Sequence, residues 1–397
     1  MTVQQRRDPL TYLTAELESL SAQGLRRSLR VLEGEQRART TFDGRDVVNL
    51  SSNNYLGLAT HPRLRERALE AVQQLGVGSG SVRTIAGTMA IHLELERRLA
   101  AFKKTEAVVV FQSGFAANAG TVSAILTRDD VIVSDELNHA SIIDGARLSR
   151  AAIKVFPHRD VDAARGILRE LPGSTRKLLI SDGVFSMDGD LGPLPALCDL
   201  AEEYGCIMMV DDAHASGVFG AHGRGTIDHF GVHGRVDVQV GTLSKAVGVL
   251  GGYVAGSRDL IEFLYHRARP FLFSTSHPPA VAAACLAAID VLEQEPEIID
   301  RLWDHTRFFK AGLRELGFDT GPSESPITPV IVGDGALAMR FSDELFREGV
   351  FAQGIAFPTV PRGRARVRTI VTATHTREAL QFALDVFANV GRRLGIV

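Results

Sequence analysis

The stretch Val236–Gly256, VDVQVGTLSKAVGVLGGYVAG, contains two charged side chains, Asp237 and Lys245. Two short apolar runs, VDVQV and GGYVAG, flank a segment in which Lys245 stands alone among Val, Leu, Ala and Gly. Apolar runs of this length, bounded by glycine, are typical of strands that are buried on both faces of a sheet. A lysine in such surroundings either extends its ammonium group to the surface or is desolvated and acts as a nucleophile.

Similar apolar runs recur from about residue 61 and alternate with segments of helical periodicity. Besides VDVQV and GGYVAG, these runs are AVVVFQ, DVIVSD, AIKVF, KLLISD and CIMMVDD. Strands that are buried on both faces and separated by helices indicate a mostly parallel sheet. We therefore predict an α/β fold whose large domain spans residues 61–285.

The two ends of the chain have different patterns. Residues 9–23 predict a helix, and Asp43-Gly44 marks the turn of a hairpin, so residues 1–60 are expected to form an N-terminal arm. The segment from PPAVAAAC to KAGLREL predicts one long helical stretch that leaves the large domain. ITPVIVG, VFAQGIAF and RARVRTIV, with a final helix from about Thr376, predict a small α+β C-terminal domain over residues 286–397.

The composition excludes several classes of function. The chain has 397 residues and a net charge of -3, which gives no basic footprint for nucleic acid. No apolar run reaches transmembrane length, and the N-terminus lacks the apolar core of a signal peptide. The three cysteines, Cys198, Cys206 and Cys285, form no C-x-x-C pair, so neither a disulfide framework nor a metal site is indicated. We expect a cytoplasmic protein without nucleic-acid, membrane or metal partners.

Polar side chains follow five of the predicted strands. Because ligands bind beyond the carboxyl ends of the strands in an open parallel sheet, these residues are expected to meet at one edge. Each has an ordinary explanation by itself, since an Asp after a strand often caps a helix and a lone His often packs in the core. Their convergence indicates a site, and the chief members are Gly114, Phe115, His139, Ser186, Asp211, His214, Thr242 and Lys245.

The chemistry of this set matches one kind of cofactor. Burial lowers the pKa of a lysine and frees its amine to bond covalently to an aldehyde, which is the functional interpretation of Lys245. The backbone N–H groups of Gly114 and Phe115, at an expected helix N-terminus, suit a phosphate. Asp211 could keep a pyridine nitrogen protonated. These are the three requirements of pyridoxal phosphate.

The motif DDAHASGVFGAHGRG, followed by GTLSKAVGVLGGYVAG, resembles the α-oxoamine synthases. These are fold-type-I pyridoxal-phosphate enzymes that condense an amino acid with an acyl-CoA. The likeness covers nearly the whole chain, because eight further motifs stand in the family's order: NLSSNNYLGLA, GSGSVRTIAGT, HLELERRLAAF, SGFAANAG, DELNHASIIDG, SDGVFSMDGD, RPFLFSTSHPP and VPRGRARVR. The resemblance implies a homodimer with a shared active site.

The resemblance also implies roles for individual residues. Lys245 would bind the cofactor and later move the α-proton of the substrate, and Asp211 would pair with the ring nitrogen. His139 would stack on the ring and help to orient the acid substrate. The phosphate and the phenolic oxygen of the cofactor would be held by a larger set, namely Gly114, Phe115, Thr242, His214 and Ser186, with Ser274 reaching the phosphate of the other subunit.

The substrate carboxylate would be held by Arg368 and Asn53. Arg368 also has a local argument, because the arginines of RARVR alternate and would share one face of a strand. A bidentate arginine suits a free carboxylate better than a lysine does. Arg364 and Arg366 are interpreted as surface residues or contacts to CoA.

Two substrate pairs remain open at this point. Glycine with acetyl-CoA would give 2-amino-3-ketobutyrate, and L-alanine with pimeloyl-CoA would give 8-amino-7-oxononanoate with loss of CO2. The alternatives are an aminotransferase or a cysteine desulfurase on the same fold, and a member that resembles 5-aminolevulinate synthase or serine palmitoyltransferase. A desulfurase needs a cysteine on a loop, whereas the cysteines here lie in helical or strand-like segments. A non-catalytic binding module would not need a lone lysine aligned with an Asp and two His.

Overall fold

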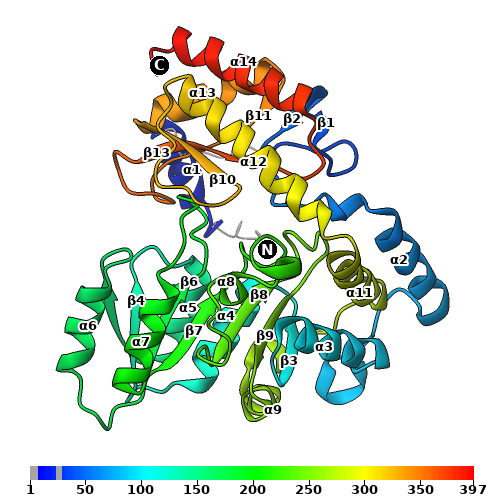
Figure 1. Ribbon diagram of the computed structural model, residues 1–397, viewed down its shortest axis with the longest axis vertical. Helices are drawn as coiled ribbons and strands as arrows, with labels where there is room; N and C mark the ends of the chain where they lie inside the picture. The colour runs from blue at the N-terminus through cyan, green and yellow to red at the C-terminus, as the bar shows by residue number, and fades with distance from the viewer. Residues whose placement is uncertain (1–7, 24–28) are drawn as a thin grey trace, which may run out of the picture.

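The structure, a computed structural model, describes residues 8–23 and 29–397. In these ranges the strands form three sheets, one of seven strands and two of three. The large sheet occupies the lower part of Figure 1, and the two small sheets lie above it with the C-terminal helices. The predicted α/β class is confirmed.

The large sheet has the strand order β3-β9-β8-β7-β6-β4-β5. Only β9 is antiparallel to its neighbours, so the other six strands share one direction, and their carboxyl ends meet at one edge. The seven predicted apolar runs all form strands of this sheet. Their bounds are β3 Ala107–Phe111, β4 Val131–Asp135, β5 Ala152–Phe156, β6 Lys177–Asp182, β7 Ile207–Asp211, β8 Val238–Thr242 and β9 Gly252–Gly256.

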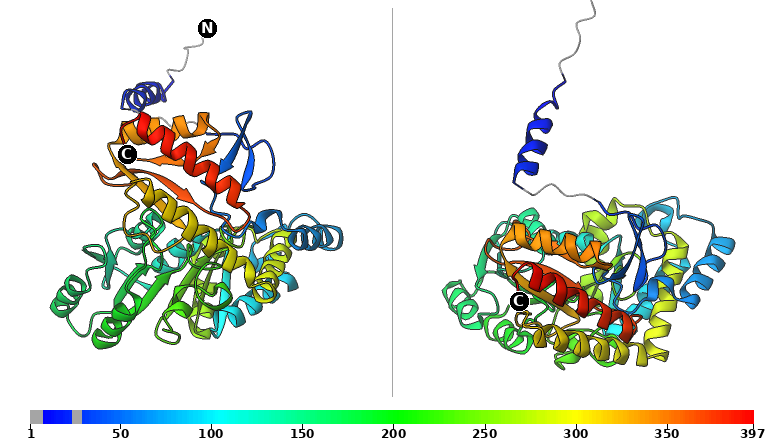
Figure 2. Two further views of the ribbon diagram at one scale, coloured as in Figure 1. Left: turned by 45° about the horizontal axis from the view of Figure 1, so that its top comes forward. Right: turned by 90° about the horizontal axis from the view of Figure 1, so that it is seen from above.

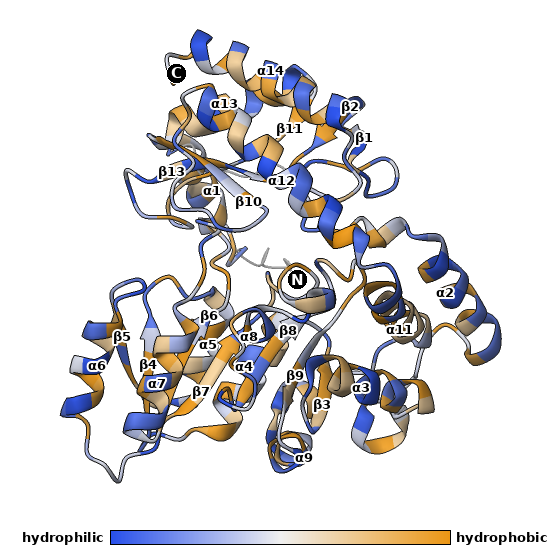
Figure 3. Ribbon diagram, in the orientation of Figure 1, coloured by the Kyte–Doolittle hydropathy of each residue, from blue (hydrophilic) through white to orange (hydrophobic). Residues whose placement is uncertain are grey.

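Helices cover both faces of this sheet, which explains why its strands are continuous apolar runs. Ile132 of β4 packs with Val122 on one face, and its neighbour Val133 packs with Leu197 on the other. In Figure 3 β7 is mostly orange, whereas an outer helix such as α14 alternates blue and orange. The helices along this part of the chain are α2 Pro62–Leu75, α3 Ala90–Lys103, α4 Gly114–Ile125, α5 Ala140–Ser149, α6 Val161–Glu170, α7 Leu194–Tyr204, α8 Thr226–His229, α9 Arg258–Arg267 and α10 Arg269–Leu272, with short helical turns at Leu58–Thr60, Arg83–Gly87 and Ala221–Gly223.

The predicted long helical stretch is two helices, α11 Pro279–Gln294 and α12 Glu297–Glu315, so that prediction was wrong in this respect. Glu295 leaves the helical conformation, with φ -126° and ψ 55°, because a residue that precedes proline is disfavoured in a helix, and Pro296 follows it. Beyond α12, an antiparallel sheet of order β10-β13-β12 packs against α13, and α14 packs against α12, α13 and β2 (Arg45–Asn49). The bounds are β10 Ile327–Gly333, α13 Gly335–Arg347, β11 Val350–Phe351, β12 Gln353–Ile355, β13 Ala365–Ile370 and α14 Arg377–Arg393.

The N-terminal segment joins this C-terminal layer. The hairpin of β1 Arg39–Phe42 and β2 Arg45–Asn49 turns at Asp43-Gly44 as predicted, and β2 pairs in parallel with β11. The helix α1 Tyr12–Ala22 buries none of its residues and stands apart from the body in Figure 2. The arm predicted over residues 1–60 falls partly outside the described residues, and the three domain boundaries stay predictions.

No helix within the described ranges combines the length and the apolar character that crossing a membrane requires.

The amino end of β9 approaches the start of α4 so closely that one position requires glycine. A Cβ on Gly252 would lie 2.4 Å from the carbonyl carbon of Ser113 and 2.5 Å from the nitrogen of Gly114. Both are backbone atoms and cannot rotate away. The glycine therefore fixes the spacing between β9 and the turn that begins α4.

We expect Gly252→Ala to lower the free energy of unfolding by about 1–3 kcal/mol or more, because the added methyl group forces backbone atoms apart. The matched control is Gly166→Ala, since Gly166 lies inside α6 and a Cβ there meets nothing within 4 Å. The control should be neutral or stabilising by up to about 1 kcal/mol. Urea denaturation followed by circular dichroism measures both, and equal midpoints for the two variants would contradict the packing argument.

Candidate active site

A cavity of about 190 Å³ lies at the carboxyl edge of the large sheet. It gathers side chains that are far apart in the sequence, from the ends of β3, β4, β6, β7 and β8. The sequence prediction that these strand ends converge is therefore confirmed. The lining residues are Ser113, Gly114, Phe115, Asn118, His139, Ser141, Asp182, Val184, Ser186, Asp211, Ala213, His214, Thr242, Ser244 and Lys245.

Lys245 follows β8 in a tight turn, in which the N–H of Gly248 donates to its carbonyl oxygen. Burial lowers the pKa of the Lys245 amine to about 8. The carboxylates of Asp211 and Asp182 oppose this shift, and the Arg368 guanidinium adds to it. About a tenth of the amine is therefore uncharged at pH 7, far more than for a solvated lysine with a pKa of about 10.4, and the uncharged amine is the nucleophile.

Asp211 ends β7 and is buried in the cavity wall, with 5% of its surface exposed. Its Oδ2 accepts a hydrogen bond from Asn118 Nδ2 at 2.6 Å, and its Oδ1 accepts one from the N–H of Ala213 at 2.9 Å. Asn118, on α4, also donates to Ser141 Oγ at 2.9 Å. The sequence reasoning missed Asn118, although a buried amide in the apolar helix AANAG was a signal that could have found it.

Asp182 is a second buried carboxyl group that the sequence reasoning did not select. It ends β6, directly opposite Asp211 in the register of the two strands. Burial, with the Asp211 charge in second place, raises the pKa of Asp182 well above its usual range. Its Oδ2 accepts the N–H of His139 at 3.2 Å, so it also anchors the turn that carries this histidine.

Two histidines, His139 and His214, face the cavity. His139 caps α5 and shares a hydrogen bond of 2.7 Å between its Nδ1 and Ser141 Oγ. His214 Nδ1 shares one of 2.7 Å with the hydroxyl of Tyr55, which the sequence reasoning missed. Burial lowers the pKa of both imidazoles, and for His214 the charges of Lys245 and Arg368 act in the same direction.

The start of α4 offers an anion site. Ser113 caps this helix by accepting the N–H of Ala116 at 3.0 Å, while the N–H groups of Gly114 and Phe115 belong to the first turn, which has no acceptors within the helix. A Cβ on Gly114 would project to within 3.5 Å of Thr242 Cβ, so the glycine keeps open the space between them. The hydroxyls of Thr242 and Ser244 lie 2.8 Å apart beside it. Ser244 follows the same strand end as Lys245, although the sequence assigned it no role.

Arg368 and Asn53 are not part of the cavity lining, and both belong to segments of the C-terminal layer. Arg368 on β13 donates from Nη1 to the carbonyl oxygen of Ser186 at 3.0 Å, and burial lowers the pKa of its guanidinium. Asn53 Oδ1 is buried and has no hydrogen-bond partner among the described residues. Its segment runs beside the end of β13, because the N–H of Ile370 donates to the Leu50 carbonyl at 2.7 Å.

Three other predicted residues lie away from the cavity. Ser274 stands between α10 and α11, half-buried, and is not part of the cavity lining. Arg364 is exposed just before β13. The interpretation of Arg366 as a surface residue or a CoA contact was wrong, because it is buried and donates to Asp188 Oδ1 at 2.7 Å and to the Met187 carbonyl at 2.8 Å. The face that it shares with Arg368 is covered by the loop after β6.

The arrangement fits pyridoxal phosphate. Lys245 supplies an amine of lowered pKa, Asp211 a fixed carboxylate, and α4 a helix N-terminus with free space beside Gly114. Asn118 Oδ1 is buried in the same wall without a partner among the described residues. The fold and this donor set together define a pyridoxal-phosphate enzyme of fold type I.

Comparison with known proteins agrees with this class. Residues 45–387 match the family model of aminotransferase class I and II. The chain is 63% identical to the 8-amino-7-oxononanoate synthase of Symbiobacterium thermophilum, over 97% of this chain and 99% of that protein. It is 57% identical to the synthase of the same name from Thermoanaerobacter pseudethanolicus, over 98% of each.

Among solved structures, a serine palmitoyltransferase from S. paucimobilis with a PLP adduct bound is similar, with a TM-score of 0.93 and 32% identity over 98% of this chain and 100% of that one. The chain therefore belongs to the aminotransferase class I and II family and, within it, to the α-oxoamine synthases. Its cofactor is pyridoxal phosphate.

The lowered pKa of Lys245 predicts a distinct pH dependence of its reactivity. In the cofactor-free protein, carbamylation of Lys245 by cyanate should rise with pH around a midpoint near 8. The same lysine in the urea-unfolded chain should show a midpoint at about 10.4, because a solvated amine stays protonated up to a higher pH. Peptide mass spectrometry after short exposure to cyanate measures both, and a folded-state midpoint at the unfolded value would show that Lys245 is not desolvated.

Proposed function

We propose that this chain condenses L-alanine with pimeloyl-CoA, releasing CoA and CO2, to give 8-amino-7-oxononanoate. The observation that carries the acyltransfer chemistry is the cavity that sets Lys245 near Asp211 and close to Arg368. The substrate pair is supported by the shared name of the two relatives that match almost the full length of the chain. The roles of the individual residues below are part of the same proposal.

Bound pyridoxal phosphate supplies an electron sink that stabilises negative charge at the α-carbon of the amino acid. Lys245 would hold the cofactor covalently and would accept the α-proton of the amino acid at its Nζ. Asp211 keeps a proton on the ring nitrogen, and the amides of Gly114 and Phe115, with Thr242, hold the phosphate. His139 stacks on the ring, while His214 and Ser186 bind the phenolic oxygen.

Arg368 and Asn53 hold the carboxylate of the amino acid. Arg368 Nη1 donates to Ser186, so the remaining N–H groups of its fork are available for a bidentate contact. Asn53 would contact the carboxylate through its side-chain NH2 group, because a carboxylate accepts hydrogen bonds and the amide oxygen cannot donate one. The α-carbon then forms a bond to the acyl carbonyl carbon as the C–S bond breaks, and CoA leaves as its thiol with one proton. The carboxylate leaves as CO2, and a second proton bonds to the α-carbon in its place. One of these two protons is the one that Lys245 Nζ accepted, and the other comes from water.

Glycine with acetyl-CoA is the alternative pair, and the names of the two relatives above do not support it. Serine with a long-chain acyl-CoA is another, since the solved neighbour is a serine palmitoyltransferase at 32% identity. Alanine and glycine differ by one methyl group, and a hydrophobic pocket discriminates such a difference by about 1–3 kcal/mol. The cytoplasmic location expected from the sequence stays a prediction.

The proposal predicts a ranking in a panel of amino acids and acyl-CoAs. Pimeloyl-CoA with L-alanine should have the highest kcat/KM, with one CO2 formed for each CoA released. A thiol reagent measures CoA, and alanine labelled with ¹⁴C at its carboxyl group measures CO2. A highest kcat/KM for glycine with acetyl-CoA would overturn the substrate pair while leaving the acyltransferase class. Keto-acid formation without any CoA release would overturn the class.

Arg368→Lys separates recognition of the amino acid from the rest of the reaction. Lysine keeps the positive charge but loses the bidentate fork, so alanine binding should weaken by about 1.5–3 kcal/mol. Binding is read from the change in cofactor absorbance on titration with alanine. The KM for the acyl-CoA should stay near the wild-type value. If alanine binds normally and acyl-CoA use is impaired, Arg368 belongs to the CoA side of the site.

The active enzyme is proposed to be a homodimer in which Ser274 binds the cofactor phosphate of the partner. Phe273 and Ile85, 69% and 82% exposed, surround the bridge between Val82 and Thr275 and give this region an apolar surface. Sedimentation at assay concentration should give the mass of a dimer, and Ser274→Ala should weaken cofactor binding. A monomer that is fully active at that concentration would contradict the shared site.

A further inference from the structure

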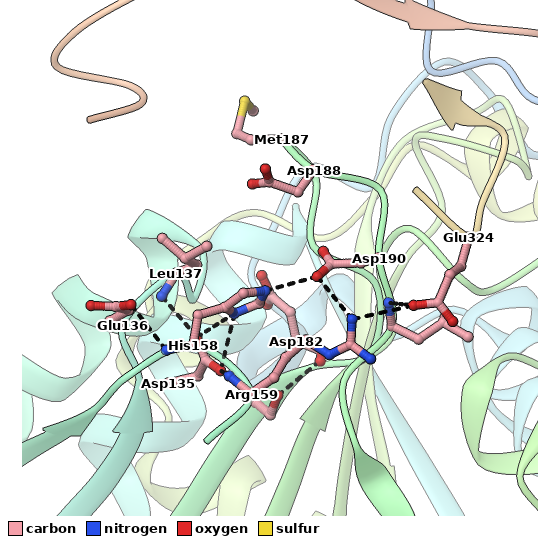
Figure 4. Close-up of polar contacts among 12 residues, drawn as sticks. Asp135, Glu136, Leu137, His158, Arg159, Asp182, Met187, Asp188, Asp190 and Glu324 are labelled. Atoms are coloured by element: carbon pink, nitrogen blue, oxygen red, sulfur yellow. Dashed lines mark hydrogen bonds and ion pairs between the residues drawn. The ribbon is translucent and has the colours of Figure 1, made fainter. Parts of the chain in front are cut away.

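His158, two residues beyond β5, is held between two buried carboxylates outside the cavity (Figure 4). Its Nδ1 lies 3.0 Å from Asp135 Oδ1, and its Nε2 lies 2.8 Å from Asp190 Oδ2. The Asp135 side chain is 0% exposed and the Asp190 side chain 1% exposed, while the ring itself packs edge-on against Phe185 with centroids 4.4 Å apart. The imidazole therefore joins two segments of the chain that are not neighbours in sequence.

Each of the two carboxylates belongs to a loop that carries a residue of the cavity. Asp135 ends β4, and its Oδ1 accepts the N–H of Leu137 at 2.9 Å at the start of the turn that leads to His139. Asp190 belongs to the segment of residues 183–192, which we call the β6–α7 loop. The backbone carbonyl of Asp190 accepts the N–H of Phe185 at 3.0 Å, so this hydrogen bond joins the two sides of the turn that contains Ser186.

The opposite side of the β6–α7 loop holds the strand that carries Arg368. The Ser186 carbonyl accepts Arg368 Nη1 at 3.0 Å, and Asp188 Oδ1 accepts Arg366 Nη1 at 2.7 Å. The Gly189 carbonyl accepts the N–H of Glu324, which lies in the C-terminal layer, at 3.0 Å. The β6–α7 loop thus connects the large sheet to β13. On the side of the large sheet, the loop is held by the contact between His158 and Asp190.

The charges around His158 favour its protonated form. A third carboxylate is close, because Glu136 Oε1 accepts the backbone N–H of His158 at 2.9 Å. Arg159 is the cation of the cluster, and its Nη1 lies 3.3 Å from both Asp190 Oδ2 and Glu324 Oε1. Burial lowers the pKa of His158, but the hydrogen bonds and charges of the two aspartates outweigh burial and raise it to about 9. A protonated ring can donate to both carboxylates, whereas a neutral ring can donate to one.

We propose that His158 is a positioning residue, which holds Ser186 and Arg368 over the cavity through Asp190 and the β6–α7 loop. The inference rests on the proposed function only where it assigns the amino-acid carboxylate to Arg368. His158 touches neither that carboxylate nor the cavity lining, so its effect on the reaction passes through the loop.

The test uses His158→Gln in the cofactor-loaded enzyme, with His233→Gln as the matched control. His233 resembles His158 in being half-buried and in having a carboxylate partner, since its Nε2 lies 2.8 Å from Asp228 Oδ1. It differs in position, because it precedes β8 at the amino edge of the sheet. We expect the dissociation constant of alanine to rise about two- to thirtyfold in His158→Gln and to stay unchanged in His233→Gln. The KM for the acyl-CoA should stay unchanged in both.

Hydrogen exchange of residues 183–192, measured by mass spectrometry and corrected for intrinsic rates, supplies a readout that does not depend on activity. The folded-state pKa of His158 is raised, so its contribution to protection should be complete below about pH 6.5 and lost as the pH rises through about 9. In His158→Gln the segment should exchange fast across the whole range. The His233→Gln protein should keep the wild-type profile.

Wild-type alanine affinity and wild-type loop protection in His158→Gln would overturn the inference, and so would equal effects in His233→Gln. Failure of the proposed function gives a different pattern. If the wild-type enzyme bound no alanine, or if Arg368→Lys left alanine binding unchanged, the assignment of the carboxylate to Arg368 would fall. The exchange profile would then decide by itself whether His158 holds the loop.

Discussion

The desolvation of one amine at the edge of a parallel sheet is the constraint on which the rest of the structure depends. Burial, with the Arg368 charge acting in the same direction, holds the pKa of Lys245 at about 8, although Asp211 and Asp182 lie close enough to oppose it. Such an environment needs a sheet that is covered on both faces, so that the turn after β8 is closed from water on most sides. The glycines of the same stretch make this closure possible, since Gly252 lets β9 touch the start of α4.

The cofactor site is assembled from the large sheet, but the proposed amino-acid site needs a second part of the chain. Arg368 and Asn53 come from β13 and from the segment after β2, which hydrogen-bond to each other's backbone near Ile370. The β6–α7 loop connects these elements to the sheet through Ser186. The proposed cofactor site and the proposed amino-acid site therefore belong to two layers of the fold. In this proposal, small movements of the C-terminal layer would change amino-acid affinity without moving the cofactor.

Much of the site could be predicted from sequence because a parallel sheet sends all its carboxyl ends to one edge. Gly114, Asp211 and Lys245 each follow an apolar run, so their convergence followed from topology alone. Asn118 and Tyr55 could not be selected in this way, because neither directly follows a strand: Asn118 lies inside α4 and Tyr55 in a loop. Their contacts with Asp211 and His214 are tertiary.

The error about Arg366 has the same tertiary origin. The alternation of the arginines correctly placed Arg366 and Arg368 on one face of β13. Sequence alone does not tell which loop covers that face. The β6–α7 loop covers it, and Arg366 forms a buried ion pair with Asp188 of that loop. The break between α11 and α12 was readable, because Pro296 disfavours a helical conformation at the residue before it. The roles of Ser274 and of the dimer depend on a second chain, which one chain's fold does not determine.

The most direct test of this account is to locate the covalent link between the protein and its cofactor. Sodium borohydride converts that link to a stable secondary amine, and peptide mass mapping then identifies the modified residue. The account predicts one phosphopyridoxyl adduct per chain, on Lys245. An adduct on another lysine would contradict it, and Lys103 is the informative case, because that lysine is also buried but is paired with Asp212 at 3.1 Å.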